Sequence, residues 1–235
     1  MKRLFIASTS TLHGGTYLEY LIEPLSKLYS GISEILFIPY ARPGGISYKD
    51  YTAKAQDAFS KLNIKVTGLQ DYENPVLAIK EAQGIFVGGG NTFVLANQLY
   101  KENVMEILRN AVKNGTPYLG TSAGSNICGL TMQTTNDMPI AYPPSFKTLG
   151  LVPFNINPHY LDPDVNSLHM GETRETRIKE FHSINSQPVI GLREGSWLDV
   201  NDTSIVLKGR LKARIFEAGK EPYEVLPETN LSILK

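Results

Sequence analysis

The sequence contains very little cysteine, with Cys128 alone among 235 residues. One cysteine excludes an internal disulfide, and the chain has no cysteine cluster of the kind that binds structural zinc. Lysine plus arginine balance aspartate plus glutamate at 23 each, and no basic run interleaves with aromatic residues. Nothing therefore indicates a nucleic-acid or membrane partner. We expect a protein of a reducing, cytoplasmic compartment that acts on a small molecule without a metal or cofactor.

The chain also lacks a long apolar run at its start. The apolar segment 4–7 is too short for a signal-peptide core and passes directly into polar residues, which favours a first strand. Hydrophobic residues make up 42% of the sequence, enough to bury one substantial core. We therefore expect residues 1–235 to form a single domain. The sequence leaves the oligomeric state open, a homodimer included.

Apolar periodicity predicts short strands that alternate with helices through the first half of the chain. Strands are expected at 4–7, 34–40, 65–69, 85–87 and 118–119, and helices at 16–28, 48–62, 75–82 and 91–114. This alternation predicts an α/β fold of three layers, in which a mostly parallel sheet has helices on both faces. The sites of such folds lie at the carboxyl ends of the strands.

The pattern changes after about residue 139, where prolines follow one another closely and predict an irregular region. A helix is expected at 172–181 and a strand at 189–192. Four further strands, at 197–200, 204–207, 213–216 and 223–226, are separated by turn residues and predict C-terminal antiparallel hairpins.

A Gly-x-Ser-x-Gly motif at 120–124 directly follows one of the expected strands. Its two glycines let a strand and a helix approach closely while Ser122 is held on a sharp turn with its hydroxyl exposed. Ala123 would begin the helix, and its backbone N–H would face the negative charge that develops during acyl transfer. The motif therefore predicts Ser122 as a nucleophile. The alternative is a chance occurrence of the same letters in a structural turn.

Three consecutive glycines, 88–90, follow the strand expected at 85–87, and Asn91 is placed to cap the next helix. Backbone N–H groups of such a loop would supply a second part of an oxyanion hole beside Ser122, or would hold a phosphate. The spacing does not fit the glycine pattern of dinucleotide-binding loops. A glycine turn that serves only tight packing is the structural alternative.

A serine nucleophile needs a general base, and the chain offers four histidines, His13, His159, His169 and His182. His159 is the preferred candidate because it ends a short apolar run, so that a strand would carry its imidazole to the sheet edge. The imidazole needs a carboxylate in turn. Glu194 follows the strand expected at 189–192, whereas Asp137 lies in a polar loop, and both remain candidates.

Several separate motifs occur together and in order: GGGNT at 88–92, GTSAG at 120–124, TNDMP at 135–139, NPH at 157–159 and GETRE at 171–175. In this combination the chain closely resembles the peptidase E family of α-aspartyl dipeptidases, from the first strand to about Trp197. The resemblance implies a cytoplasmic serine peptidase that releases aspartate from Asp-X dipeptides. It also implies a fold similar to the class I glutamine amidotransferases, with cyanophycinase as a relative.

The resemblance implies that Ser122 is the nucleophile and His159 the general base, with Glu194 or Asp137 orienting the histidine. Gly89 and Gly90, with Ala123, would donate backbone N–H groups to the oxyanion. Arg174 would bind the aspartate side chain of the substrate, because a guanidinium grips a carboxylate with two parallel hydrogen bonds. Asn91 is a further substrate-binding candidate. Arg177 is the alternative to Arg174, with Arg42 and Arg193 as less favoured arginines.

As the third member of the catalytic triad we favour Glu194, because a strand at 189–192 in the parallel sheet would leave it beside Ser122. Asp137 would then steady its loop or receive the substrate ammonium.

Two rival functions stand beside this interpretation. One is an α/β-hydrolase esterase, suggested by the same motif and by His13-Gly14-Gly15. The other is a catalytically silent amidotransferase-like domain whose glycine loop binds an anion.

Overall fold

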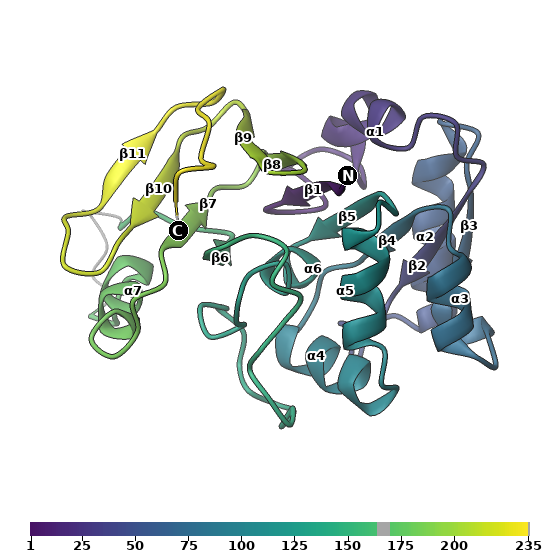
Figure 1. The fold of residues 1–235 in the computed structure, drawn as a ribbon, viewed down its shortest axis with the longest axis horizontal. Coiled ribbons are helices and arrows are strands. Elements are labelled where there is room, and N and C mark those ends of the chain that lie inside the picture. Colours follow the sequence, from purple (N-terminus) through teal and green to yellow (C-terminus); the bar gives the residue numbers. More distant parts are fainter. Residues whose placement is uncertain (164–169, 235) are drawn as a thin grey trace.

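The computed structural model of the chain describes residues 1–163 and 170–234. Its centre is a seven-stranded sheet in the order β3-β2-β4-β5-β1-β8-β9 (Figure 1). These strands are β1 (Arg3–Ala7), β2 (Glu34–Ile38), β3 (Lys65–Gly68), β4 (Ile85–Val87), β5 (Tyr118–Thr121), β8 (Ser196–Asn201) and β9 (Ser204–Gly209). The first five pair in parallel, and the hairpin β8–β9 joins β1 in antiparallel orientation. The predicted mostly parallel sheet is confirmed.

Helices cover both faces of this sheet because alternate strand residues point to opposite sides. Ile35 and Phe37 of β2 belong to a buried cluster with the 3-10 helix η1 (Glu19–Leu21) and the helices α1 (Ile22–Leu28) and α2 (Tyr48–Ser60). Leu36 and Ile38 belong to the cluster on the other face. That face is covered by α3 (Pro75–Glu81), α4 (Thr92–Lys101), α5 (Met105–Lys113) and α6 (Ala123–Asn126), and a short 3-10 helix, η2 (Leu69–Asp71), leads into α3. The predicted three layers are therefore present.

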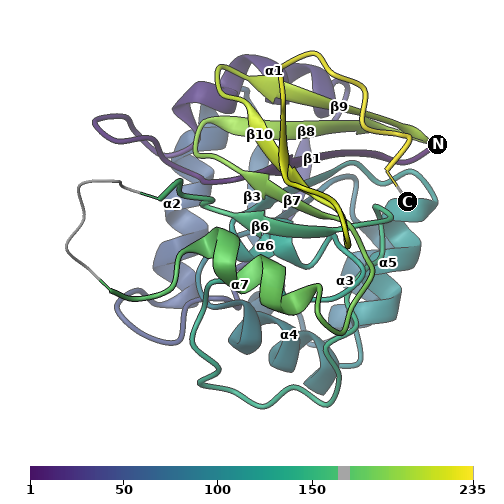
Figure 2. The same ribbon diagram turned by 90° about the vertical axis from the view of Figure 1, so that its left-hand side faces the viewer.

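A second sheet of four strands, in the order β11-β10-β7-β6, packs beside the first (Figure 2). Its strands are β6 (Asn155–Pro158), β7 (Val189–Leu192), β10 (Ala213–Phe216) and β11 (Tyr223–Val225). Ile156 and Ile190 join the large core of the main sheet, while Val189 packs with Ile178 of helix α7 (Arg174–Phe181) on the opposite face. Strand β7 is consequently buried along its whole length.

The expectation that strand 189–192 lies in the main parallel sheet is wrong. β7 pairs in parallel with β6 and in antiparallel orientation with β10, within the second sheet. The physical reason is that β8 already occupies the free edge of β1, so that no partner position remains there. The C-terminal strands do form the predicted hairpins, β8–β9 in the first sheet and β10–β11 in the second.

The helices expected at 48–62 and 75–82 end slightly early, at Ser60 and Glu81, and three others differ more from their predicted bounds. The helix expected at 91–114 is two helices, because Asn103 adopts a left-handed backbone (φ 57°) between α4 and α5. The helix expected from residue 16 begins only at Glu19, after Leu18, which is also left-handed. The helix expected from residue 172 begins at Arg174, because the Thr173 side chain accepts the Thr176 N–H and caps it.

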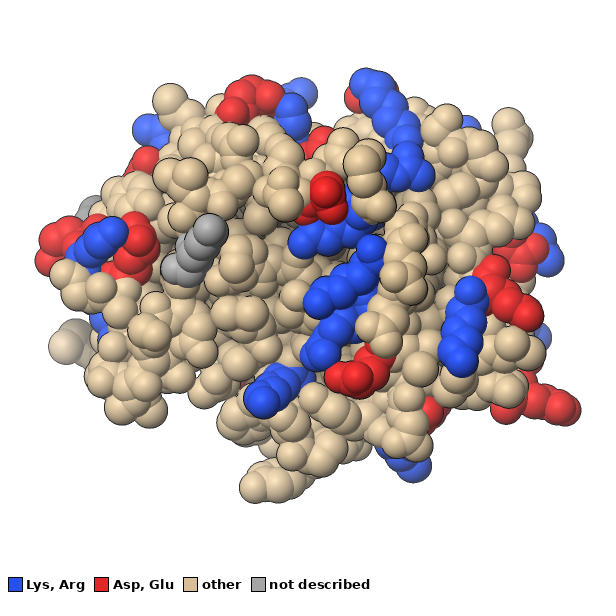
Figure 3. Space-filling model, viewed as in Figure 1, with Lys and Arg blue, Asp and Glu red and all other residues tan. Residues whose placement is uncertain are grey.

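Charged side chains are unevenly distributed on one face of the molecule (Figure 3). On the face in Figure 3, basic side chains gather in a band near the middle, while acidic side chains lie mainly toward the two ends. Within the described ranges, no helix combines the length and the apolar character needed to cross a bilayer.

Candidate active site

Ser122 lies on a sharp turn between β5 and α6. Its backbone adopts φ 54° and ψ −110°, a strained conformation for a residue with a side chain, and its N–H donates to Ala7 O at 3.2 Å. A Cβ added to Gly120 would lie 2.4 Å from the Gly124 oxygen, and one added to Gly124 would lie 2.3 Å from Val87 O. The predicted strand, turn and helix with close glycine packing are confirmed. Helix α6 has only four residues, so its dipole contributes little.

His159 and Glu194 complete a chain of polar contacts that begins at Ser122. The Ser122 Oγ lies 2.9 Å from Nε2 of His159, and Nδ1 of His159 lies 2.7 Å from Oε1 of Glu194. The two partners come from adjacent parallel strands, His159 directly after β6 and Glu194 two residues after β7. This pairing puts the imidazole between the hydroxyl and the carboxylate. An imidazole so placed can take a proton from the serine while the carboxylate stabilises the resulting imidazolium.

The backbone of His159 is held by a residue that the sequence did not single out. The Ser8 hydroxyl, buried just after β1, accepts the His159 N–H at 2.9 Å and donates to Leu192 O at 2.7 Å. His159 itself has φ 54°, which takes its side chain out of the strand direction. Ser8 therefore ties the ends of β6 and β7 to the end of β1. Its only signal in the sequence is a polar residue at the end of an expected strand.

Asp137 lies near the site but contacts other groups. Its Oδ2 accepts the Thr92 N–H at 2.7 Å and the Thr135 hydroxyl at 2.9 Å, at the start of α4. Asn91 caps the same helix through Val94 N–H, as predicted, and its amide donates to Met138 O at 2.8 Å. Among the described residues, Asp137 makes no hydrogen bond to His159. The geometry thus pairs Glu194, and not Asp137, with the histidine.

The glycine loop after β4 lies against Ser122, but one of its predicted donors is engaged elsewhere. The Gly89 N–H donates to the Tyr51 hydroxyl at 3.0 Å, so in this structure it is not free to serve the predicted oxyanion hole. By contrast, the N–H groups of Gly90 and Ala123 make no hydrogen bond within residues 1–163 and 170–234. These two N–H groups, on either side of Ser122, remain as the candidate oxyanion donors.

Arg174 is the first residue of α7 and is half-buried. Its guanidinium forms neither an ion pair nor a hydrogen bond with any other residue that the structure describes. Burial, and after it the charge of Arg177, lowers the pKa of Arg174, whereas Asp137 and Glu194 act in the opposite direction. The cation therefore lies within electrostatic range of both carboxylates of the site. Arg177 is more exposed and lies 3.9 Å from Glu172.

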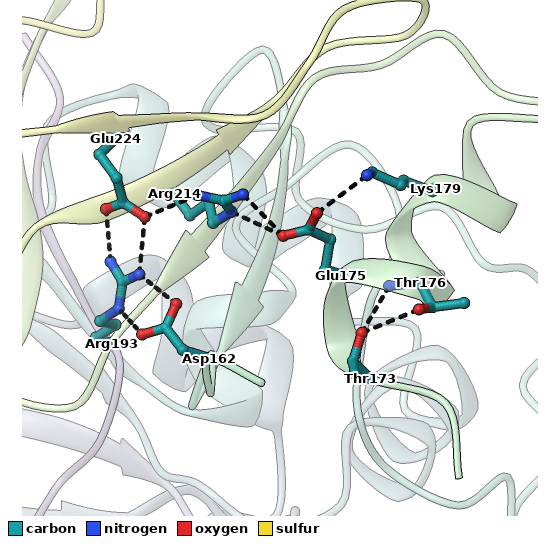
Figure 4. Close-up of polar contacts among 8 residues, drawn as sticks. All are labelled: Asp162, Thr173, Glu175, Thr176, Lys179, Arg193, Arg214 and Glu224. Atoms are coloured by element: carbon teal, nitrogen blue, oxygen red, sulfur yellow. Dashed lines mark hydrogen bonds and ion pairs between the residues drawn. The ribbon is translucent and has the colours of Figure 1, made fainter. Parts of the chain in front are cut away.

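An ion-pair network fixes α7 to the strands of the second sheet (Figure 4). Arg214 of β10 binds Glu175 of α7 at 2.9 Å and Glu224 of β11 at 3.2 Å. Arg193 binds Glu224 and Asp162, at 2.9 and 2.6 Å, and these carboxylates raise its pKa. Because its guanidinium is fully engaged, Arg193 is a structural residue. The network anchors the start of α7, from which Arg174 projects.

The remaining candidate groups lie away from this arrangement. His13 is exposed in the loop after β1, and His182 contacts Gln187 O at 2.9 Å, while His169 lies outside the described residues. Cys128 is fully buried, which raises the pKa of its thiol to about 12, so it is no competing nucleophile. The part of the chain that the structure describes holds no cluster of three metal-ligating side chains.

Comparison with known proteins places the chain among peptidases. Residues 4–208 match the model of the family described as Peptidase family S51. "Peptidase E" of Streptomyces coelicolor is 46% identical over 231 residues, which cover 98% of this chain and 94% of the relative. "Probable alpha-aspartyl dipeptidase" of Drosophila melanogaster is 44% identical, and the match covers 99% of this chain and 97% of the relative. The crystal structure of a peptidase from an acI-B1 Actinobacterium shares the fold, with a TM-score of 0.71 at 18% identity over 99% of this chain and 97% of that one.

Proposed function

The chain belongs to peptidase family S51, and on that premise we propose that it is a serine dipeptidase that hydrolyses Asp-X dipeptides. The observation that carries the proposal is the continuous contact of Ser122, His159 and Glu194, at 2.9 and 2.7 Å. The names of two relatives, Peptidase E and alpha-aspartyl dipeptidase, support the substrate class.

In the proposed reaction, Ser122 Oγ attacks the carbonyl carbon of the N-terminal aspartyl residue while His159 Nε2 takes the hydroxyl proton. The oxyanion that forms is stabilised by the N–H groups of Gly90 and Ala123. His159 then gives its proton to the departing amine of residue X, which leaves an aspartyl ester on Ser122. Water, activated by the same imidazole, hydrolyses this ester and releases aspartate.

The charges around the site match those of an Asp-X substrate. The half-buried Arg174 supplies a cation for the aspartate side chain, and a guanidinium binds a carboxylate with two parallel hydrogen bonds. Asp137 and Glu194, which lie within electrostatic range of Arg174, provide negative potential for the free ammonium of the dipeptide. Asn91 contributes to the site by holding the loop that contains Met138 close to the start of α4.

A panel of Asp-X, Glu-X, Asn-X and β-Asp dipeptides tests this proposal directly, with p-nitrophenyl acetate as a general ester. We expect turnover of Asp-X alone among the peptides, and loss of nearly all of it in Ser122→Ala, by roughly 10⁶-fold. Ester turnover without dipeptide turnover would instead identify an esterase. Absence of both, with no covalent labelling of Ser122 by a fluorophosphonate, would identify a silent binding domain.

A further inference from the structure

The carbonyl of Gly89 accepts two hydrogen bonds from outside the glycine loop. One comes from Arg42 Nε and the other from the Tyr51 hydroxyl, both at 3.2 Å. The same Tyr51 oxygen accepts the Gly89 N–H at 3.0 Å. One hydroxyl therefore binds both polar backbone groups of Gly89 and fixes the conformation of that residue. Neither Arg42 nor Tyr51 contributes a group to the reaction proposed above.

The peptide group that joins Gly89 to Gly90 contains both this carbonyl and the Gly90 N–H. No cis peptide bond occurs among the described residues, and in a trans peptide the C=O and N–H point in opposite directions. Donors that hold the Gly89 oxygen on the Arg42 and Tyr51 side consequently turn the Gly90 N–H away from that side. A Cβ added to Gly89 would lie 2.9 Å from Ser122 Cβ, so this segment directly adjoins the nucleophile.

The two donors are themselves well held. The Tyr51 ring is buried and packs edge-on against Phe37, with ring centroids 4.9 Å apart. The Arg42 guanidinium lies over the same Tyr51 ring, 5.4 Å from its centroid. Next to Arg42, the Ala41 oxygen accepts the Asn91 N–H at 2.7 Å, which joins the loop after β2 to the end of the glycine loop. The supports of the Gly89 carbonyl are therefore joined to one another and to the main sheet.

We propose that Arg42 and Tyr51 are positioning residues of the oxyanion hole. They hold the Gly89–Gly90 peptide so that the Gly90 N–H faces the oxygen that becomes negative when Ser122 attacks. The positive charge of Arg42 on the carbonyl also polarises the peptide, which makes its N–H a stronger donor. This inference rests on the proposed function, because it assigns a role within the same acyl-transfer site.

The test compares Arg42→Met and Tyr51→Phe with two matched controls. Lys54→Met removes a cation that lies over the neighbouring Tyr17 ring, at 5.0 Å, without contacting Gly89. Tyr72→Phe removes a hydroxyl that donates to Thr67 Oγ1 at 3.0 Å, without contacting Gly89 or Tyr51. All four substitutions keep the apolar part of the side chain, and thermal unfolding of each variant verifies that it is folded.

Three measurements separate positioning from a general structural effect. Complete loss of an oxyanion donor lowers kcat by roughly 10²–10³-fold. Because Arg42→Met and Tyr51→Phe would displace the Gly90 N–H without removing it, each should lower kcat for Asp-X by about 10- to 100-fold. Inhibition by an aspartyl boronate, which forms a tetrahedral adduct on Ser122, should weaken by a similar factor. Inhibition by free aspartate and the KM for Asp-X should stay within about twofold of wild type. Both controls should match wild type throughout.

Equal loss of boronate and aspartate affinity in the two variants would overturn the proposal, as would unchanged kcat. The rate at which a small neutral fluorophosphonate labels Ser122 gives an independent reading, because phosphonylation also develops charge in the oxyanion hole. If the wild type is labelled but hydrolyses no Asp-X, the proposed function fails while the labelling rates still test Arg42 and Tyr51. Slower labelling in these two variants alone would then support the positioning role.

Discussion

Replacement of Glu194 by Gln tests the proposal that this carboxylate orients the imidazole of His159. The carboxylate lies 2.7 Å from His159 Nδ1, and in the proposed reaction it holds the ring and stabilises the imidazolium that forms when Ser122 attacks. Glutamine keeps the size of the side chain but removes its charge. Because the charge acts only after the proton has moved to His159, the loss should fall on kcat, with KM little changed.

The magnitude follows from the exposure of the pair. Two unit charges about 4 Å apart interact by about 4 kcal/mol near a protein surface and by about 1 kcal/mol in bulk water. The Glu194 side chain is 51% exposed and that of His159 is 34% exposed, so the pair lies between these limits. A loss of about 1–4 kcal/mol corresponds to a decrease in kcat of about 5- to 1,000-fold. Removing the charge of a fully buried carboxylate would lower kcat further.

The matched control is Asp137→Asn, an equally conservative change at the second candidate carboxylate. Asp137 binds the start of α4 through the Thr92 N–H, so its amide variant should leave kcat near wild type and raise KM through weaker binding of the substrate ammonium. Steady-state kinetics with Asp-Leu measures both constants. If Asp137→Asn collapses kcat with KM unchanged while Glu194→Gln remains near wild type, the roles must be exchanged.

Three shorter predictions concern the surroundings of the site. Arg174→Ala should lower kcat/KM for Asp-X by roughly 30- to 150-fold, which corresponds to about 2–3 kcal/mol of transition-state stabilisation, and Arg177→Ala should not. The opposite ranking would identify Arg177 as the binding residue. Iodoacetamide should leave the native enzyme active because Cys128 is buried, and inactivation would contradict this. The hydrogen bond from Arg193 lowers the pKa of Asp162. The ionised Asp162 carboxylate therefore stabilises the fold above about pH 4, and this stabilisation is lost at lower pH. Asp162→Asn should thus destabilise the protein at pH 7 but not at pH 2 in urea titrations; equal stability of the two proteins at pH 7 would contradict the role of this pair.

Much of the main sheet could be predicted because each of its strands is a short apolar run with a turn at its end. The positions of Ser122 and of the glycine loop follow from that pattern, since they end the neighbouring strands β5 and β4. Helix ends were less predictable. The left-handed residues Leu18 and Asn103 break apolar periodicity that continues on either side, and neither is a glycine that would signal a break.

The roles of Ser8, Tyr51 and Arg42 could not be predicted, because they depend on contacts between segments far apart in the chain. The Tyr51 hydroxyl meets Gly89 across 38 positions, and Ser8 meets His159 across 151. Nothing in the local sequence distinguishes the hydroxyl of Tyr51 from that of any other helical tyrosine. For the same reason, the availability of the Gly89 N–H to a substrate could not be judged from three consecutive glycines.

The choice between Glu194 and Asp137 shows how an expected contact can be present although the sheet from which it was expected is wrong. Glu194 was expected beside Ser122 because its strand would join the parallel sheet, yet β7 belongs to the second sheet. What brings Glu194 to the site is the parallel register of β6 and β7, which pairs Pro158 with Leu192. His159 and Glu194 each follow one member of that pair, so their separation is set by adjacent strands. Ser8 then fixes this pair of strand ends to β1, whose Ala7 oxygen also accepts the Ser122 N–H, and so both sheets hold the site together.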